Sequence, residues 1–396
     1  LDSTFCKRTG LGRTFWPKCL LISLSTSPVP FGHAFLQLHP RTIPHVELFP
    51  VISRAVPKYR VAIQSHNDNK DNDNALLDAI YQMKDAAPHM DAKRIFHGKG
   101  EYYPGLEHLT LDWFDPVFLL TSHNQDLEDD EVQTYRQALQ ETFHPENEEV
   151  SLVYQCRNVN TPTVTRIISG PSPPNPHIVT EQNGTLKYIV DITRNQNHGL
   201  FLDMANGREF VLNDAQEKNV LNLFAYTCGF SVAALIGGAR QVVNMDMSHG
   251  ALKVGQRNHD CNGIGRTHDS RGKARFLAHD IFKSWGKLKK LGPYDLIIMD
   301  PPSYQTGSFV AKKDYIKLIR RIPSLITPNG KAMLCLNAPE LNSKFLIDLV
   351  EDTIPDELEF VRQIKNPASF ADLDSERSLK VLLFQKSHNQ PNIINE

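Results

Sequence analysis

A short motif late in the chain combines one carboxylate, two prolines and an aromatic residue. Asp300-Pro301-Pro302-Ser303-Tyr304 follows the apolar run at 294–299. The prolines have a fixed φ and make a rigid platform. Asp300 or the adjacent carbonyls can accept hydrogen bonds from an amino group on a flat base, and Tyr304 can stack on that base. The motif predicts a site for a planar, amino-bearing acceptor, with a plain proline-rich loop as the alternative.

An earlier loop has the features of a cofactor-binding turn. Asn222-Leu223-Phe224-Ala225-Tyr226-Thr227-Cys228-Gly229-Phe230-Ser231 leads from an apolar run towards a helical stretch. Gly229 permits close approach of a ligand to the backbone, and Ser231 can cap the helix. A dinucleotide site would need G-x-G-x-x-G, but this loop has only Gly229. We therefore expect a nucleoside cofactor without phosphates; the alternative is an ordinary turn.

Two further carboxylates end the next apolar runs. Asp246 lies 24 residues after Asn222 (246 − 222 = 24), close to the roughly 20 residues that separate the glycine turn from the ribose-binding acid in Rossmann folds. A carboxylate there can accept hydrogen bonds from both ribose hydroxyls. Asp280 can accept one from an adenine amino group. For each residue, the alternative is capping of the helix that follows.

The elements that must position these residues alternate between strand and helix after Gly199. We expect strands at 220–224, 241–246, 274–278, 296–299, 331–336, 358–363 and 379–385. Helices are expected at 231–236, 248–261, 309–326 and 345–352. This alternation predicts an α/β fold, with a mostly parallel sheet covered by helices on both faces and a ligand beyond the carboxyl ends of its strands.

The chain before this region divides into two parts. Residues 76–184 combine an acidic helix at 127–143 with short strands, and they predict a small α+β domain ahead of a catalytic domain at 185–388. Residues 1–75 contain a basic, acid-poor segment and the polar run at 66–74, so we expect a poorly ordered leader and linker, followed at the other end by a tail at 389–396. An organelle transit segment is the alternative for the basic leader.

Composition limits the partners. The net charge of −2 means that nucleic-acid contact requires a local basic patch. Such a patch is expected where Lys313, Lys317, Arg320 and Arg321 share one helical face, although a solvated face would have the same pattern. The six cysteines are scattered without a C-x-x-C pair, so we expect no metal and a reducing compartment such as the cytoplasm. No apolar run reaches the roughly 20 residues of a membrane helix.

Together these motifs resemble class I S-adenosylmethionine-dependent methyltransferases. Arg194–Lys386 is more narrowly similar to the bacterial large-subunit enzymes that methylate bases of 23S rRNA, and 96–106 resembles their central domain. The resemblance implies a Rossmann-like seven-stranded sheet with its last strand antiparallel, S-adenosylmethionine as cofactor and RNA, expected to be rRNA, as substrate. It implies cofactor contacts at Phe201, Asp203, Asn222, Phe224, Ala225, Tyr226, Thr227, Gly229, Asp246, Met247, Asp280 and Asp300.

Whether the enzyme methylates a carbon or a nitrogen atom depends on the presence of a nucleophilic cysteine. Family members that methylate cytosine C5 use a nucleophilic cysteine after the fifth strand, and the matching position here is Asn337. Cys335 lies two residues earlier in an apolar run, where a thiol is usually inert. C5 methylation requires covalent activation of the ring. We therefore expect transfer to a nitrogen, with cytosine C5 and a protein or small-molecule acceptor as alternatives.

Two other classes of protein compete with a methyltransferase. A nicotinamide-dependent oxidoreductase would need the missing glycines. An inactive RNA-binding protein of the same fold would not need an intact Asp300-Pro301-Pro302 motif. The sequence leaves the oligomeric state open.

Overall fold

The structure is a computed structural model that describes residues 75–84, 91–143, 148–158, 161–194, 196–264, 273–302, 304–305 and 309–387. The tail expected at 389–396 and all but the last residue of the leader and linker expected at 1–75 lie outside these ranges. No helix in the described ranges is both long and apolar enough to span a membrane.

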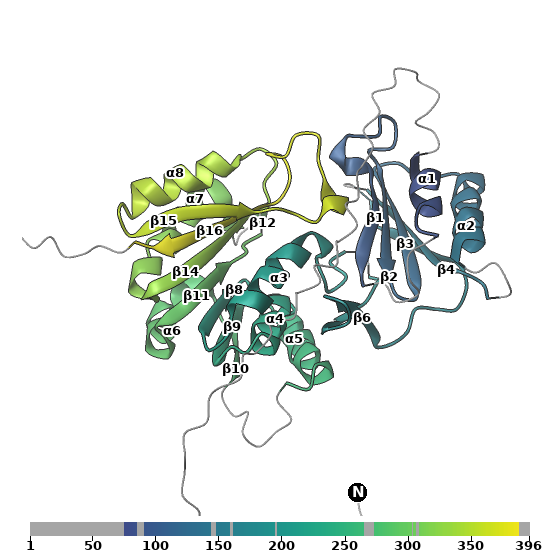
Figure 1. Cartoon of the computed structure of the whole chain (residues 1–396). Coiled ribbons are helices and arrows are strands. Elements are labelled where there is room, and N and C mark those ends of the chain that lie inside the picture. Colours follow the sequence, from purple (N-terminus) through teal and green to yellow (C-terminus); the bar gives the residue numbers. More distant parts are fainter. Residues whose placement is uncertain are drawn as a thin grey trace, which may run out of the picture. The chain divides into compact units, whose positions relative to one another are not determined.

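The first sheet lies within residues 76–184, the segment that the sequence predicts to form a small α+β domain. Its five strands lie in the order of the chain, and every neighbouring pair is antiparallel except β3 and β4. The helix α2 (Asp129–Phe143) makes the crossover between these two strands, and α1 (Ala75–Tyr81) packs beside it (Figure 1). The strands are β1 (Lys93–His97), β2 (Leu109–Phe114), β3 (Val117–His123), β4 (Ser151–Arg157) and β5 (Val164–Ser169).

The two faces of this sheet differ because side chains alternate along a strand. In β2, Leu109 and Leu111 belong to the core that α1 and α2 cover. Thr110 and Asp112 occupy the alternate positions and line a cavity on the other face. The sheet therefore presents a polar face opposite its helices.

A hairpin connects the two sheets in sequence. It consists of β6 (His177–Glu181) and β7 (Leu186–Val190), so the boundary predicted between 184 and 185 falls in its turn. Glu181 accepts hydrogen bonds from the guanidinium of Arg208 on α3 (Ala205–Asp214), and both side chains are buried. This pair joins the hairpin to the second sheet's helices; removal of one partner would leave an uncompensated buried charge.

The second sheet has the strand order β10-β9-β8-β11-β14-β16-β15. Its strands pair in parallel except β16, which is antiparallel to both neighbours. This confirms the predicted seven-stranded α/β sheet with an antiparallel last strand. The strands are β8 (Asn219–Leu223), β9 (Gln241–Asp246), β10 (Ala274–Ala278), β11 (Tyr294–Met299), β14 (Ile326–Leu336), β15 (Leu358–Ile364) and β16 (Lys380–Lys386).

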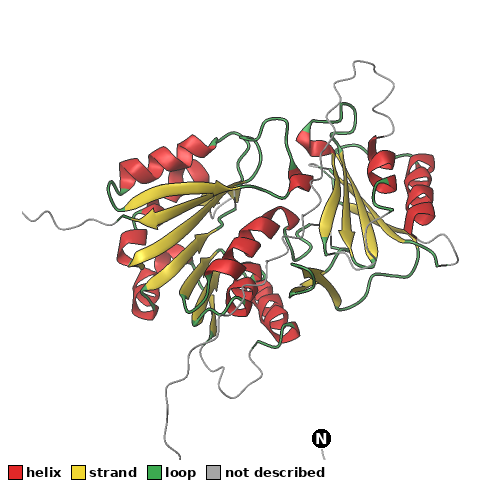
Figure 2. Ribbon diagram, in the orientation of Figure 1, coloured by secondary structure: helices red, strands yellow, loops and turns green. Residues whose placement is uncertain are grey.

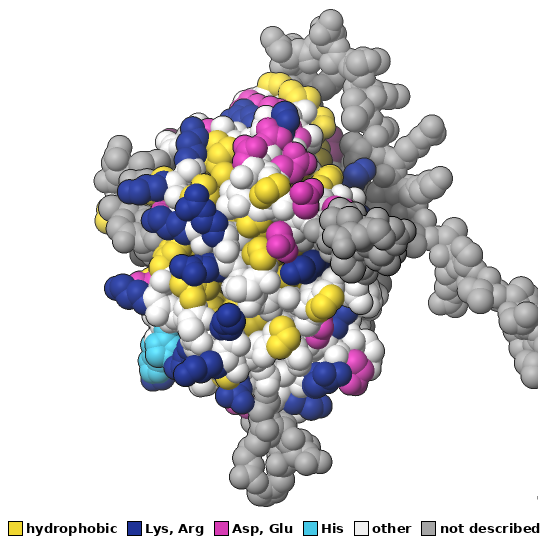
Figure 3. Space-filling model, turned by 90° about the vertical axis from the view of Figure 1, so that its left-hand side faces the viewer, with side chains coloured by type: hydrophobic (Ala, Val, Ile, Leu, Met, Phe, Trp, Pro, Cys, Tyr) yellow, Lys and Arg dark blue, Asp and Glu magenta, His cyan; other side chains and the backbone are white. Residues whose placement is uncertain are grey.

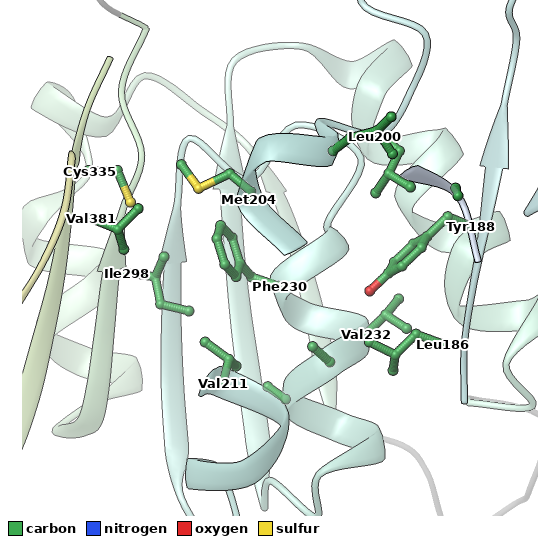
Figure 4. Close-up of a cluster of buried hydrophobic side chains, with 14 of the residues drawn as sticks. Leu186, Tyr188, Leu200, Met204, Val211, Phe230, Val232, Ile298, Cys335 and Val381 are labelled. Carbon is green, nitrogen blue, oxygen red and sulfur yellow. The ribbon is translucent and has the colours of Figure 1, made fainter. Parts of the chain in front are cut away.

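Helices cover both faces of this sheet (Figure 2). On one face, α3 and α4 (Gly229–Ile236) pack on alternate residues such as Ile298 and Met333. Figure 4 shows this cluster, in which Phe230 of α4 lies towards Ile298 of the sheet and Val232 lies beside Leu186 of β7. On the other face lie α6 (Trp285–Leu291), α7 (Ala311–Ile319) and α8 (Ser343–Thr353).

One predicted helix is too long. The stretch expected to be helical at 309–326 contains the short strand β13 (Phe309–Val310), then α7, and then a 3-10 turn at Ile322–Ser324. Pro323 lies at the start of that turn, where it cannot donate the next α-helical hydrogen bond. The helix therefore ends earlier, and β14 begins at Ile326 rather than at 331.

Candidate cofactor and acceptor site

The carboxyl ends of five parallel strands form one edge of the second sheet. The pairing register places Leu223 of β8 beside Met245 of β9 and Met299 of β11, so the residues after these strands emerge together. This edge collects the loop Phe224–Gly229, Asp246, Asp280, Asp300 and Asn337, which lie at or just after the carboxyl ends of β8, β9, β10, β11 and β14, respectively. The structure thus brings together predicted residues that span more than a hundred positions in the sequence.

The loop after β8 has a strained backbone. Phe224, Tyr226 and Cys228 have positive φ values of 57°, 47° and 62°. For residues other than glycine, this left-handed conformation costs roughly 1–2 kcal/mol each. It persists because neighbouring groups fix the loop: Thr227 Oγ1 donates to the carbonyl of Gly199 (2.7 Å), and Asn258 Nδ2 donates to the carbonyl of Thr227 (2.9 Å). Such strain is typical of ligand-binding turns.

Asp246 is held by two backbone donors. The N–H groups of Tyr226 and Ser248 donate to its two oxygens at 2.8 and 2.7 Å. The cap of α5 (His249–Cys261) is Ser248, whose Oγ accepts from Ala251, so Asp246 is not the capping side chain. Each carboxylate oxygen keeps acceptor capacity for a ligand hydroxyl. Met247 beside it is 63% exposed and offers an apolar surface.

The first and last residues of the predicted cofactor loop, Asn222 and Ser231, are buried below the turn. Asn222 is buried and donates to Asn244 Oδ1 (2.9 Å), and Asn244 donates to Ser231 Oγ (2.9 Å). Ser231 also bonds the buried His259, whose pKa is lowered by burial. The prediction that Ser231 caps α4 is wrong, because Cys228 occupies the N-cap position and makes no side-chain cap. A contact between Asn222 and the cofactor stays a prediction.

Two glycines near the loop have different roles. A Cβ added to Gly229 would make ordinary contacts, 3.4 Å from Arg208 Cδ, so packing within the described chain does not require glycine there. A Cβ at Gly255 on α5 would lie 2.5 Å from Cys228 Sγ, so this glycine lets α5 approach the loop. Sequence reasoning missed Gly255 and Asn258, since one glycine and one amide in a helix carry no distinctive spacing.

Asp280 is a capping residue. Its Oδ1 accepts from the N–H of Phe282 (2.9 Å) at the start of a 3-10 turn, and its Oδ2 lies 3.3 Å from Lys283 Nζ. The capping alternative is thus correct. A hydrogen bond from Asp280 to an adenine amino group stays a prediction, since its oxygens retain further acceptor capacity.

Asp203 and Asp300 form the acidic centre of the edge. Asp203 lies on a 3-10 turn at Leu202–Met204, and Asp300 directly follows β11. Burial raises the pKa of Asp300 to about 7, with a further contribution from the Asp203 carboxylate, while Arg208 opposes the shift. Burial also raises the pKa of Asp203. Within the described ranges, no hydrogen bond or ion pair holds the side chain of Asp300, which leaves it available to a ligand.

The two prolines of the motif are packed into the protein. Pro301 is buried and Pro302 is half-buried, in agreement with a fixed platform. The backbone of Tyr304 pairs with Val310. Its side chain lies outside the described part of the structure, so stacking of Tyr304 on a base stays a prediction.

Cys335 and Asn337 end β14 in different environments. Cys335 is fully buried, and Figure 4 shows it beside Val381 in the core. Burial raises the pKa of its thiol well above the usual value, which leaves it protonated and unreactive at neutral pH. Asn337 is exposed and lines a cavity of about 440 Å³ together with Phe201 and Asp203.

The predicted basic face is present but lies away from this cavity. Lys313, Lys317, Arg320 and Arg321 are exposed, whereas Tyr315, Leu318 and Ile319 are buried, as the periodicity predicts. None of the four basic residues lines the cavity. Lys317 pairs with Asp314 (2.7 Å), and Arg321 lies over the ring of Trp285. Figure 3 shows Lys and Arg side chains scattered over much of one face of the molecule.

Comparison with known proteins supports a nucleoside cofactor. The family model for S-adenosylmethionine-dependent methyltransferases matches residues 93–385. The chain is similar to proteins named ribosomal RNA large subunit methyltransferase I. In Erwinia tasmaniensis the identity is 29% over 74% of each chain. In Aeromonas hydrophila it is 38%, over 35% of this chain and about a third (34%) of the relative's length.

Solved structures agree on the fold. An S-adenosylmethionine-dependent methyltransferase from Streptococcus mutans superimposes with a TM-score of 0.65 at 23% identity, covering 78% of this chain and 80% of the other. A methyltransferase solved in complex with SAH matches to the same extent. A methyltransferase from Agrobacterium tumefaciens matches with a TM-score of 0.55 at 16% identity, covering 76% of this chain and 92% of the other.

Proposed function

Because the chain belongs to the S-adenosylmethionine-dependent methyltransferases, we propose that it transfers a methyl group to a nitrogen atom of an RNA base, in ribosomal RNA. The observation that carries this proposal is the position of Asp300, whose carboxylate lacks a described partner at the carboxyl end of β11. The names of the relatives, which are ribosomal RNA methyltransferases, support RNA as substrate.

The residues of the second sheet's edge fit S-adenosylmethionine. Asp246, held by two backbone donors, has the acceptor capacity for the ribose hydroxyls, and Asp280 for the adenine amino group. Met247 and Phe201 are exposed apolar side chains that can cover the adenosine. The Phe224–Gly229 loop and Asp203 complete the surroundings. When bound, this cofactor supplies a methyl group on a positively charged sulfur.

The acceptor side of the site performs positioning and proton transfer. Asp300 accepts a hydrogen bond from the N–H of the target base, which raises the electron density on the attacking nitrogen. As the new N–C bond forms and the C–S bond breaks, the nitrogen loses its proton, and the ionised Asp300 is the group placed to receive it. A pKa of about 7 suits this role, since a general base works best near the operating pH.

A nitrogen acceptor is favoured because neither Cys335 nor Asn337, at the end of β14, offers a usable thiol. C5 methylation needs a nucleophile that adds to the ring. Cys335 is fully buried with a raised pKa, and Asn337, which is exposed at the corresponding place, cannot act as that nucleophile. A lone pair on nitrogen requires no such activation. Cytosine C5 and a protein acceptor are the competing outcomes.

The basic residues on α7 and just after it are candidates for holding RNA outside the site. Lys313, Lys317, Arg320 and Arg321 are exposed and can contact phosphates, which add affinity without sequence preference.

The four cysteines in the described ranges are free thiols, and they support a reducing compartment such as the cytoplasm.

The test is transfer of a tritiated methyl group from S-adenosylmethionine to deproteinised rRNA, followed by digestion to nucleosides. We expect label in an N-methylated nucleoside. Label in 5-methylcytosine would contradict the nitrogen assignment. In a parallel assay on ribosomal protein, label in the protein together with none in the rRNA would contradict the substrate. Asp246→Ala, which should not bind the cofactor well, is the control for contaminating activity.

A further inference from the structure

One wall of the cavity beside the acceptor site is cationic. The cavity of about 440 Å³ is lined from the first sheet by Arg94 on β1, Lys99 just after β1, and Arg157 at the end of β4. His123, at the end of β3, lies among them. Asp203, on the 3-10 turn before α3, and Asn337, just after β14, line the same cavity. The cationic wall and the acceptor edge therefore face one shared space.

The positive charges of Arg94, Lys99 and Arg157 on this wall are not all paired with an acidic residue. Arg94 forms a two-pronged ion pair with Asp112 (2.8 and 3.0 Å) and stacks on Phe370. Among the residues that the structure describes, Arg157 donates to uncharged groups, Gln155 Oε1 (2.8 Å for the closer bond) and His198 Nε2 (2.9 Å). Across the described ranges, Lys99 has neither an ion pair nor a hydrogen bond.

Within the described ranges, no acid of the cavity forms an ion pair with Lys99 or Arg157, although the Asp112 carboxylate attracts both electrostatically. Glu101 is paired with Arg377. Asp372 contacts His97 at 3.3 Å, and the side chain of Asp374 accepts from the backbone of Glu376. Asp203 lies on the 3-10 turn before α3, where burial raises its pKa. The charge of the cavity is thus separated into a cationic part at Lys99 and Arg157 and acidic parts elsewhere.

The lowered pKa values of Lys99 and His123 agree with several positive charges lying close together on this wall. Burial, followed by the guanidinium groups of Arg94 and Arg157, lowers the pKa of Lys99 to about 8. Burial, followed by Lys99 and Arg157, lowers the pKa of His123 to about 3, so its imidazole is neutral. An anion placed between Lys99 and Arg157 would relieve the repulsion. Although protein surrounds Lys99 on most sides, its side chain is still accessible to solvent in the cavity, so such an anion has access.

We propose that Lys99 and Arg157 bind a backbone phosphate of the RNA next to the target nucleotide. This inference rests on the proposed RNA substrate. A volume of about 440 Å³ lies within the range of pockets that hold one small molecule, which suits a single nucleotide. With its phosphate on the cationic wall, the nucleotide would direct its base towards Asn337 and Asp203. The first sheet would then orient the RNA, while residues at the edge of the second sheet act on the base.

The test compares two variants of the wall with two matched controls. Lys99→Gln and Arg157→Gln each remove one charge from the cavity. Lys84→Gln and Arg136→Gln remove the same charges from the same domain at positions that do not line the cavity. For each protein we would measure methyl transfer, the dissociation constant of an rRNA transcript at several salt concentrations, and cofactor binding by calorimetry. Inorganic phosphate serves as a second, free-anion probe.

We expect each wall variant to bind the transcript about tenfold more weakly. Its salt slope should be smaller by about 0.7 for each phosphate of a single strand that the variant no longer binds. Cofactor affinity should match the wild type, and the KM for RNA should rise more than kcat falls. Because Lys99 has no described partner, Lys99→Gln should fold normally. Arg157→Lys, which keeps the charge, should recover most of the RNA affinity if Arg157→Gln is unstable.

The outcomes separate this inference from the proposed function. If the wild type neither binds nor methylates RNA, the proposed function is wrong. If the wild type methylates RNA but the wall variants behave like the controls, the phosphate site is wrong. If Lys99→Gln loses only the binding of inorganic phosphate, the wall holds a free anion and the RNA contact is refuted.

Discussion

The carboxylate of Asp203 raises the pKa of Asp300, although the two residues come from segments almost a hundred positions apart. Burial is the larger cause, and together they bring the pKa of Asp300 to about 7. A carboxyl group with this pKa changes charge within the physiological range. The structure therefore couples the proposed proton acceptor to pH.

The first prediction concerns this coupling. Asp300 can accept a proton only when it is ionised, so methyl transfer should fall as the pH drops through about 7 and level off above it. We expect log kcat/KM for RNA to rise with a slope of one up to that pH. Asp300→Asn should remove this limb of the profile. A wild-type profile that is flat between pH 5.5 and 8.5 would contradict the assignment.

The second prediction concerns the ribose-binding carboxylate. Asp246→Ala removes two hydrogen bonds to a charged group, each of which contributes about 1.5–3 kcal/mol, so cofactor affinity should fall at least tenfold. Calorimetry measures the dissociation constant. Asp260→Ala, an exposed carboxylate on α5, is the matched control and should bind normally. An unchanged constant for Asp246→Ala would place the cofactor elsewhere.

The third prediction tests a positioning residue. Asn258 accepts from the N–H of Ile189 (2.8 Å) and donates to the carbonyl of Thr227, so it ties α5 to the hairpin and to the cofactor loop. Asn258→Ala leaves both buried backbone groups unsatisfied, at a cost of about 1–3 kcal/mol each in the free energy of unfolding. Denaturant titration measures this loss, and cofactor affinity should fall with it. Gln256→Ala, exposed on the same helix, should change neither quantity.

If Asn258→Ala lowers stability but leaves cofactor affinity unchanged, Asn258 is structural only. Gly255→Ala provides a second perturbation of the same region, since its Cβ would press on Cys228. Both variants should weaken cofactor binding if the strained loop must be held in place.

The fourth prediction concerns the buried thiol. Cys335→Ser places a hydroxyl in an apolar cluster, so it should lower the free energy of unfolding by about 1–3 kcal/mol and leave the rate of methyl transfer largely intact. The readouts are thermal unfolding and the methylation rate. A normally folded but inactive variant, or a covalent adduct between Cys335 and RNA in the wild type, would show that the acceptor is cytosine C5.

The second sheet could be predicted from sequence because each strand end carries its own local signal. The runs before Asp246 and Asp300 are apolar and of strand length, and the residue after each is a carboxylate. Helix ends were harder to predict: Ser231 has the chemistry of a cap, but tertiary packing buries it against His259 instead. The residue type of Ser231 favours a helix cap, but in the structure its hydroxyl bonds to the buried side chains of Asn244 and His259.

The cationic wall could not be predicted in this way. Lys99 and Arg157 are 58 residues apart (157 − 99 = 58), on elements whose order in the sheet is not encoded by spacing. One signal was available in β2, where the alternation Leu109-Thr110-Leu111-Asp112 indicates a strand with one apolar and one polar face. That pattern predicts a polar face but does not identify which distant residues share it.

The central claim is that Asp300 acts on the nitrogen of an RNA base. Its most direct test is the single-turnover rate of rRNA methylation by Asp300→Asn at pH 8, with the product identified by nucleoside analysis. We predict that the rate falls at least a hundredfold, as expected for loss of a general base, while the cofactor dissociation constant stays within about threefold of the wild type. An Asp300→Asn protein that forms the same methylated nucleoside at the wild-type rate would contradict the account.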